Sequence, residues 1–119
     1  MPKIDNFQLG KIIVSGKSYA HDILILVDGT VKRRDDVFLN FVSHTVKQAE
    51  IAELLKGYPE VIVVGTGTEE KVRLSFNIER LVTELKADLI ALPSPKAVTR
   101  YNQFLDESKR VAALIHVTD

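Results

Sequence analysis

Val61-Ile62-Val63-Val64-Gly65-Thr66-Gly67 is the stretch that decides the fold of this chain. Four consecutive apolar residues are typical of a strand that is buried on both faces. The Gly-Thr-Gly sequence that follows leaves two interpretations open. Its backbone N–H groups could hold an anion, because ligands of α/β sheets collect at the carboxyl ends of the strands. It could also be only the tight exit of a buried strand.

The residues after this turn favour the structural interpretation. Glu69 and Glu70 stand where a dinucleotide-binding fingerprint would continue towards its third glycine, and no Gly-Lys-Ser/Thr sequence follows as in a P-loop. Two carboxylates beside the turn would also repel a phosphate. We therefore favour a structural turn, or a turn that lines a small pocket, over a nucleotide-phosphate site.

The spacing of apolar residues predicts three helices around this strand. The first begins at a capping box formed by Thr45 and Gln48. The second covers residues 76–86. The third is capped by Ser94 and carries Pro95 at its first position.

Strands alternate with these helices. Residues 89–92 form a second apolar run and predict another buried strand, and residues 111–117 predict the last strand. Only two residues separate the third helix from the last strand, so the direction of that strand stays open. This alternation indicates a mainly parallel sheet with helices on its faces.

The first third of the chain predicts strands. Residues 7–14 form a β-rich run, and residues 21–27 form a strand that is apolar on both sides. Asp28-Gly29 is a strong hairpin signal, and residues 30–34 form a return strand polar enough to be an edge. Residues 35–44 contain four large apolar side chains, so we expect them to lie against the core.

The composition is that of an ordinary globular chain. Of 119 residues, 45% are hydrophobic and 27% are charged. Basic and acidic residues number 16 each, so the chain lacks the positive surplus that nonspecific nucleic-acid binding requires. The run Lys32-Arg33-Arg34 is followed at once by two aspartates, which predicts a solvated strand end.

Cellular location is predicted from what the chain lacks. Without cysteine it has no disulfide scaffold, thiol nucleophile or cysteine-ligated zinc. No apolar run approaches the ~20 residues of a membrane helix, and the first residues lack the apolar core of a secretory signal. We expect one cytoplasmic domain over residues 1–119, without membrane insertion.

The histidines and three residues near the chain's end are candidate site residues. His21, His44 and His116 are not at metal-ligand spacing, and a structural role is favoured for each. His44 has the best claim to more, because helix entrances have free backbone donors. Tyr101, Asn102 and Arg110 are likewise expected to be structural first, with Asn102 tying a loop to its helix.

Four blocks of sequence, taken together, resemble a known family of small α/β proteins. They are H-D-I-L-I-L-V-D-G (21–29), Y-P-E-V-I-V-V-G-T-G (58–67), K-A-V-T-R-Y-N (96–102) and K-R-V-A-A-L-I-H-V-T-D (109–119). The family includes an adipogenesis-associated cytoplasmic protein, a mitochondrial complex I (NADH dehydrogenase) assembly factor, and uncharacterised bacterial and archaeal members. The resemblance covers essentially the whole chain.

The resemblance implies a three-layered fold with a mixed central sheet, and assembly or interaction roles without a settled catalytic activity. The family positions that recur correspond here to Gly65, Gly67, Tyr101, Asn102 and Arg110.

One departure from the family pattern precedes the last strand. Where the family commonly has Glu-Gly-Arg, this chain has Glu107-Ser108-Lys109-Arg110. The change alters the end of the third helix just before Arg110.

Together these observations predict an α/β fold of three layers. Its parts are a mixed, mainly parallel central sheet, an N-terminal β-hairpin or meander, and three helices. The function we expect is that of a non-enzymatic protein-interaction or assembly factor.

The alternative is a small-molecule or anion-binding protein, which could be an enzyme, with its pocket at the carboxyl ends of the strands. The candidate pocket residues are Gly65, Thr66, Gly67, Tyr101, Asn102, Arg110 and His44. Another protein is the expected partner, with a second copy of the chain and a small molecule as open alternatives. Neither nucleic acid, nor a metal, nor a cofactor is expected.

Overall fold

The apolar stretch Val61–Val64 lies inside the main sheet. The computed structural model describes residues 2–34, 45–46, 48–67, 73–74 and 78–117. Within this part of the chain, β7 (Val61–Gly65) is buried along its whole length, as its apolar run predicted. Val61 and Val63 face one hydrophobic core, and Ile62 and Val64 face a second core on the other side of the sheet.

Within the described residues, the main sheet has five strands in the order β5-β4-β10-β7-β9. Their bounds are β4 (Ile23–Ile25), β5 (Val31–Arg33), β9 (Asp88–Leu92) and β10 (Val111–Ile115), besides β7. β10 and β9 both run parallel to β7, whereas β4 runs antiparallel to β10 and to β5. The expectation of a mainly parallel sheet is therefore wrong, because the β4–β5 hairpin joins the same sheet and contributes two antiparallel pairings.

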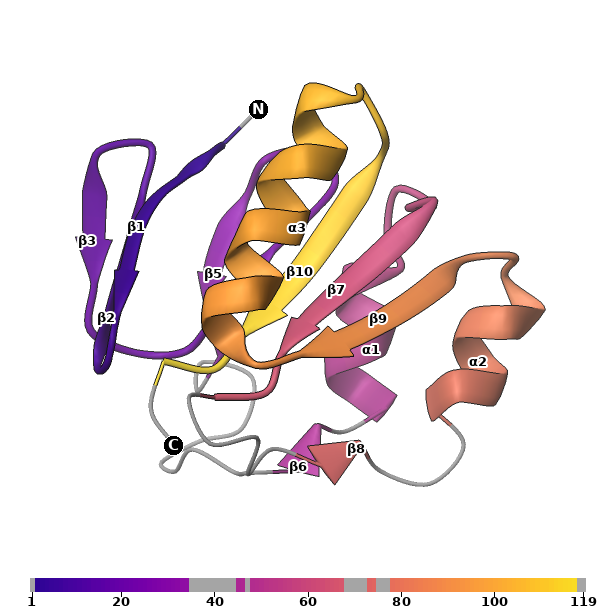
Figure 1. The fold of residues 1–119 in the computed structure, drawn as a ribbon. Helices are drawn as coiled ribbons and strands as arrows, with labels where there is room; N and C mark the ends of the chain where they lie inside the picture. The colour runs from indigo at the N-terminus through magenta and orange to yellow at the C-terminus, as the bar shows by residue number, and fades with distance from the viewer. Residues whose placement is uncertain (1, 35–44, 47, 68–72, 75–77, 118–119) are drawn as a thin grey trace.

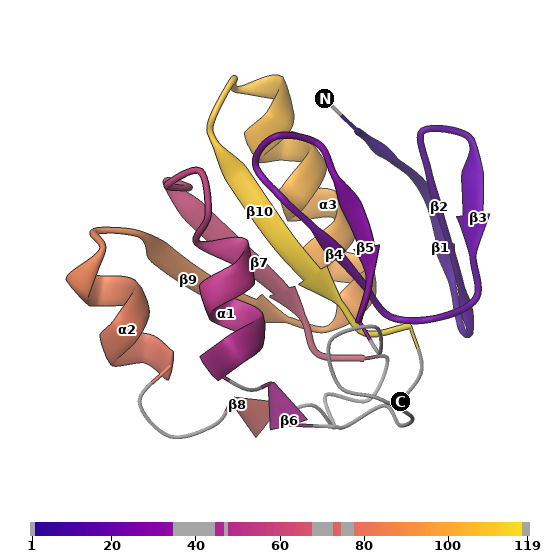
Figure 2. The ribbon, with the colours of Figure 1, turned by 180° about the vertical axis from the view of Figure 1, so that it is seen from behind.

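Helices cover both faces of this sheet. α3 (Ser94–Asp106) packs against β7 and β10 on one face, which is the near side of the sheet in Figure 1. α1 (Gln48–Leu54) and α2 (Ile78–Glu84) lie on the opposite side, which Figure 2 shows from behind. For the part of the chain that the structure describes, the three layers and the three helices are confirmed. None of the helices in the described part of the chain is long and apolar enough to cross a membrane.

A separate antiparallel sheet of three short strands flanks the main sheet (Figures 1 and 2). It consists of β1 (Ile4–Gln8), β2 (Lys11–Val14) and β3 (Lys17–Tyr19). Residues 7–14 are thus two strands joined by a turn at Leu9 and Gly10, not one run. Ile12 and Val14 are buried in the core under α3, which attaches this meander to the body of the protein.

Two helix starts differ from the sequence prediction. Thr45 belongs to a two-residue strand, β6 (Thr45–Val46), which pairs with β8 (Arg73–Leu74), and α1 begins only at Gln48. At α3 the N-cap position is Pro93 and no side chain caps the helix. The capping roles expected of Thr45 and Ser94 are therefore wrong.

β9 is also less buried than its sequence predicted. Among the described strands it ends the main sheet, and its residues are exposed or half-buried in contrast to β7 and β10. An apolar run predicts burial on both faces but contains no information about how many strand neighbours it will have. The segment 35–44, expected against the core, lies outside the described residues.

Candidate functional site

The Gly65-Thr66-Gly67 turn lies at the carboxyl edge of the main sheet, as expected, and its donors are engaged. The N–H of Thr66 donates to the carbonyl of Leu92 at 2.8 Å, and the N–H of Gly67 donates to Ser94 Oγ at 2.9 Å. Ser94 Oγ in turn donates to the carbonyl of His116 at 2.6 Å. These hydrogen bonds tie the exits of β7, β9 and β10 to the start of α3.

Glycine occupies each of these two positions, 65 and 67, for a different physical reason. A Cβ at Gly65 would lie 2.8 Å from Ser94 Oγ and 3.2 Å from Ser94 Cα, so the residue lets α3 approach the sheet closely. Gly67 has a φ of 94°, a conformation that other residues adopt only with strain. The turn is therefore a strand exit that exploits the freedom of glycine.

A buried ionic cluster, which no local pattern of the sequence indicates, lies at the same edge. It consists of Asp22, Arg34, Glu50 and His116, all nearly inaccessible to solvent. Arg34 Nη1 donates to Asp22 Oδ2 at 2.9 Å, Arg34 Nη2 donates to Glu50 Oε1 at 3.2 Å, and Arg34 Nε donates to Glu50 Oε2. His116 Nδ1 lies 2.5 Å from Asp22 Oδ2. The cluster connects β4, β5, α1 and β10.

The interpretation of residues 32–34 as a solvated strand end is wrong for Arg34. Its side chain is 3% exposed, although Arg33 beside it is exposed. Side chains alternate across a strand, so Lys32 and Arg34 lie on the α1 side, where Lys32 also pairs with Glu53 of α1. A run of basic residues is expected to be solvated. This expectation fails when the fold brings an acidic residue of another element against one of them, as Glu50 is brought against Arg34.

The surroundings of the cluster keep Asp22 and Arg34 ionised. Burial by itself raises the pKa of Asp22, but hydrogen bonds from His116 and from the N–H of Val117 outweigh it and lower that pKa below its ordinary value. Burial likewise opposes the charge of Arg34, and the carboxylates of Glu50 and Asp22 raise its pKa above the ordinary range. Arg34 and Asp22 are therefore charged at neutral pH, and Arg34 bridges two buried acids.

This cluster fits a clamp better than a reaction centre. Its printed bonds join strand ends and a helix that are far apart in the sequence, and its members are buried from solvent. In the described part of the chain, no three His, Asp or Glu side chains are placed to hold a metal ion. The arrangement stabilises the carboxyl edge of the sheet.

Tyr101 and Asn102 lie elsewhere, on α3 against the meander. The Asn102 amide donates to the carbonyl of Ile4 at 2.8 Å and accepts the N–H of Ile4 at 3.0 Å, as a neighbouring strand would. Tyr101 is fully buried, and its hydroxyl donates to the carbonyl of Pro2 at 2.9 Å. Burial raises the pKa of Tyr101 far above its ordinary value. Both residues fasten β1 to α3, so Asn102 ties a distant strand to the helix.

Replacing Tyr101 by Phe tests this attachment. We expect the free energy of unfolding to fall by about 0.5–1.5 kcal/mol, because the carbonyl of Pro2 loses its donor while the ring stays packed. Urea denaturation measures the change. Tyr58→Phe is the matched control, since Tyr58 is 75% exposed, and equal effects of the two variants would contradict the assigned role.

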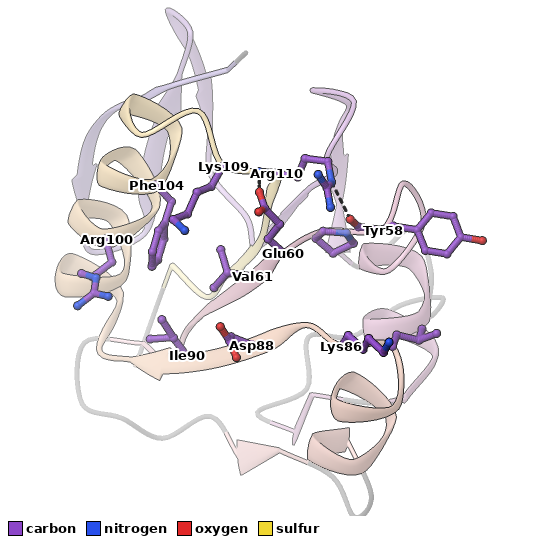
Figure 3. A pocket seen from close by; sticks show the side chains of 12 residues that line it. Tyr58, Glu60, Val61, Lys86, Asp88, Ile90, Arg100, Phe104, Lys109 and Arg110 are labelled. Carbon is purple, nitrogen blue, oxygen red and sulfur yellow. Dashed lines mark hydrogen bonds between the residues drawn. The ribbon is translucent and has the colours of Figure 1, made fainter.

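Arg110 lies at the opposite edge of the sheet, where β7, β9 and β10 begin. Its backbone N–H donates to Glu60 Oε2 at 2.8 Å, which lowers the pKa of Glu60, and its Nε donates to the carbonyl of Tyr58 at 3.0 Å. These contacts hold the guanidinium beside the strand starts (Figure 3). Arg110 therefore cannot share a pocket with the Gly65-Thr66-Gly67 turn.

A concave surface with a volume of about 550 Å³ lies beside Arg110, and we call it the amino-end surface (Figure 3). Val61, Ile90 and Phe104 are among its apolar lining residues, and we call these three its floor. Four basic residues line it, namely Lys86, Arg100, Lys109 and Arg110, together with the two acids Glu60 and Asp88. The guanidinium of Arg100 lies over the ring of Phe104, 5.1 Å from its centroid. Positive charge thus gathers around an apolar floor on a chain whose formal charge is zero.

The structure distributes the predicted pocket residues over separate places. Gly65, Thr66 and Gly67 form the carboxyl-edge turn, Tyr101 and Asn102 hold the meander, and Arg110 borders the amino-end surface. His44 lies outside the described residues.

The fold and these sites define a small three-layer α/β protein with a mixed sheet and an attached meander. The chain belongs to the family described as "Protein of unknown function (DUF498/DUF598)", whose model matches residues 4–116. No curated protein matches the chain. Membership of a small α/β family is thereby confirmed.

Solved structures share the fold over the whole chain. A structure described as "MT938" is 30% identical, with a TM-score of 0.81 and full coverage of both chains. A conserved hypothetical protein from Pyrococcus horikoshii, PH1505, is 29% identical, with a TM-score of 0.78 over 98% of this chain and 99% of that one. A Bartonella henselae structure described as an outer membrane protein is 22% identical, with a TM-score of 0.80 over 99% of this chain and 96% of that one. The last likeness concerns the fold alone.

Proposed function

We propose that this protein binds another protein through the amino-end surface and acts as an interaction or assembly factor. The observation that carries the proposal is the apolar floor of Val61, Ile90 and Phe104 surrounded by four basic side chains. Interfaces combine an apolar centre with a polar rim, and Tyr and Arg are enriched in them. Tyr58, at the border of this surface, is 75% exposed.

The charges indicate the kind of partner. Of the two acids at the surface, Glu60 already accepts the N–H of Arg110, whereas the side chains of Lys86, Arg100 and Lys109 are exposed. A partner with an acidic surface would therefore be attracted and oriented. The family that the chain resembles includes an assembly factor, which supports the same function. The cytoplasmic location expected from the sequence is part of this proposal.

The alternative, a small molecule or anion at the carboxyl edge, has less support from the geometry. The N–H groups of Thr66 and Gly67, which would have to bind the ligand, donate to Leu92 and Ser94 instead. An anion there would have to displace hydrogen bonds that hold three strand ends together.

Site-specific photocrosslinking tests the proposal. A benzophenone amino acid at Tyr58, in cells that express the protein at its native level, should yield a discrete crosslinked species. The matched control places it at Leu9, which is 63% exposed in the turn of the meander, on another part of the molecule. If both positions gave the same products, or neither gave any, the amino-end surface would not be the interface.

Charge reversal tests the role of the basic residues. We expect Lys86→Glu combined with Lys109→Glu to reduce the crosslinked fraction at Tyr58 at least about tenfold, and wild-type crosslinking to weaken as salt rises. Lys11→Glu, in β2, is the control and should leave the yield unchanged, because Lys11 does not line the surface. Unchanged crosslinking in the double variant would contradict an acidic partner.

A further inference from the structure

The free edge of β9 borders the amino-end surface. The N–H of Asp88 donates to the carbonyl of Glu60 at 3.0 Å, and the carbonyl of Leu92 accepts the N–H of Thr66 at 2.8 Å, so both residues turn their main chain towards β7. Main-chain groups alternate in direction along a strand, and those of Leu89 and Ala91 therefore point away from β7. In the part of the chain that the structure describes, no strand pairs with this side of β9.

The two edges of the main sheet differ in their protection. At the other edge, β5 carries Lys32 and Arg33, and charged side chains of this kind discourage pairing with another chain. β9 has no charge after Asp88, since Leu89-Ile90-Ala91-Leu92 are all apolar, and Ala91 is exposed. An apolar edge strand without protecting charges is a template for an added strand.

On the basis of the proposed function, we infer that the partner adds an extended acidic segment to β9 as a sixth strand of the main sheet. Lys86 lies at one end of β9 and Arg100 at the other, on the side where Ile90 faces α3 (Figure 3). Carboxylates on the α3 side of the added strand would lie between these cations. Apolar side chains on its other side would extend the core that Leu89 contacts.

Charge selects this occupant over a second copy of the chain. Two β9 strands paired antiparallel are related by a two-fold axis perpendicular to the sheet, which keeps both α3 helices on the same side. This pairing puts the amino end of one β9 beside the carboxyl end of the other, so Lys86 of each copy would lie opposite Arg100 of the second copy. Like charges placed opposite each other disfavour that arrangement, whereas an acidic segment is complementary.

A designed peptide tests strand addition separately from charge attraction. The probe is a ten-residue peptide of alternating Glu and Val with a fluorescent label, titrated with the protein. We expect saturable binding that weakens at least about tenfold when alternate peptide nitrogens are methylated, because methylation removes the donors that a strand needs but keeps the charges. A peptide of alternating Lys and Val should not bind.

Two readouts on the protein locate the added strand. Ala91→Pro should weaken peptide binding at least about tenfold without removing a hydrogen bond to β7, because the Ala91 N–H points outward. Ala91→Thr keeps that N–H and should bind like the wild type. In the wild type, the peptide should slow hydrogen exchange of the Leu89 and Ala91 amides, a measurement that stands even if Ala91→Pro does not fold.

Several outcomes would overturn the inference. Equal binding of the methylated peptide, absence of peptide binding, or unchanged exchange at Leu89 and Ala91 would each refute strand addition, and the proposed function would survive if Tyr58 still crosslinked to an acidic protein. A dimer in sedimentation equilibrium that Ala91→Pro dissociates would show that a second copy occupies the edge instead. Failure of the Tyr58 crosslink would refute the proposed function itself.

Discussion

Replacing Arg34 by Met is expected to lower the free energy of unfolding by about 3–5 kcal/mol. Arg34 is buried between Asp22 and Glu50 and donates hydrogen bonds to both carboxylates. Met fills a similar volume but leaves two acids buried without their shared cation. The loss of the cation that compensates two buried acids, and not lost packing, is the source of the effect.

The control for this variant is Arg80→Met. Arg80 also pairs with a glutamate, Glu84, at 3.3 Å, but the two side chains are 76% and 61% exposed. Exposed ion pairs of this kind contribute less than about 1 kcal/mol. Urea denaturation of both variants measures the difference, and a cost for Arg34→Met no larger than that for Arg80→Met would show that the cluster is not a clamp.

Gly65→Ala is expected to lower the free energy of unfolding by about 1–3 kcal/mol through overpacking. The new methyl group would lie 2.8 Å from Ser94 Oγ and 3.3 Å from Ile115 Cδ1. Ser94 cannot simply turn away, because its hydroxyl accepts the N–H of Gly67 and donates to the carbonyl of His116. Either α3 shifts from the sheet or these hydrogen bonds break.

A double-mutant cycle with Ser94→Ala separates the steric cause from a general effect on the strand. Removal of Oγ relieves the shortest contact, so Gly65→Ala should cost less in the Ser94→Ala background than in the wild type. Denaturant midpoints of the four proteins give the coupling. Additive effects, within about 0.5 kcal/mol, would mean that the close approach of Ser94 is not the reason for glycine at this position.

Of the two residues, Gly65 could be recognised as special from the sequence and Arg34 could not. Gly65 could be singled out because two glycines at the end of an apolar run mark an unusual turn, although its close contact with Ser94 is seen only in the structure. Arg34 could not, because its partners Asp22 and Glu50 are 12 and 16 residues away in the sequence. His116, which also binds Asp22, is 94 residues from Asp22. Ion pairs between distant segments leave no periodic pattern in the sequence.

The order of the strands was also beyond the reach of the local pattern. Val61–Val64 and Leu89–Leu92 are equally apolar, yet among the strands of the described residues β7 has a neighbour on each side and β9 has one. Apolar content reports how much surface a segment tends to bury, whereas its number of neighbours depends on where the connections place it. The unprotected edge of β9, on which the proposed strand addition depends, emerged only from the topology.

By itself, the sequence determined the α/β class, three helices, the buried strand at Val61–Val64 and the turn at Gly65-Thr66-Gly67, because periodicity and turn chemistry act between near neighbours. Only the tertiary structure decided that the sheet is evenly mixed, that Arg34 is buried among acids, and that Arg110 lies at the opposite edge from Gly65. The physical reason is that these features depend on which distant segments come together. The residues next to a charge or a strand in the sequence do not determine whether it is buried or paired.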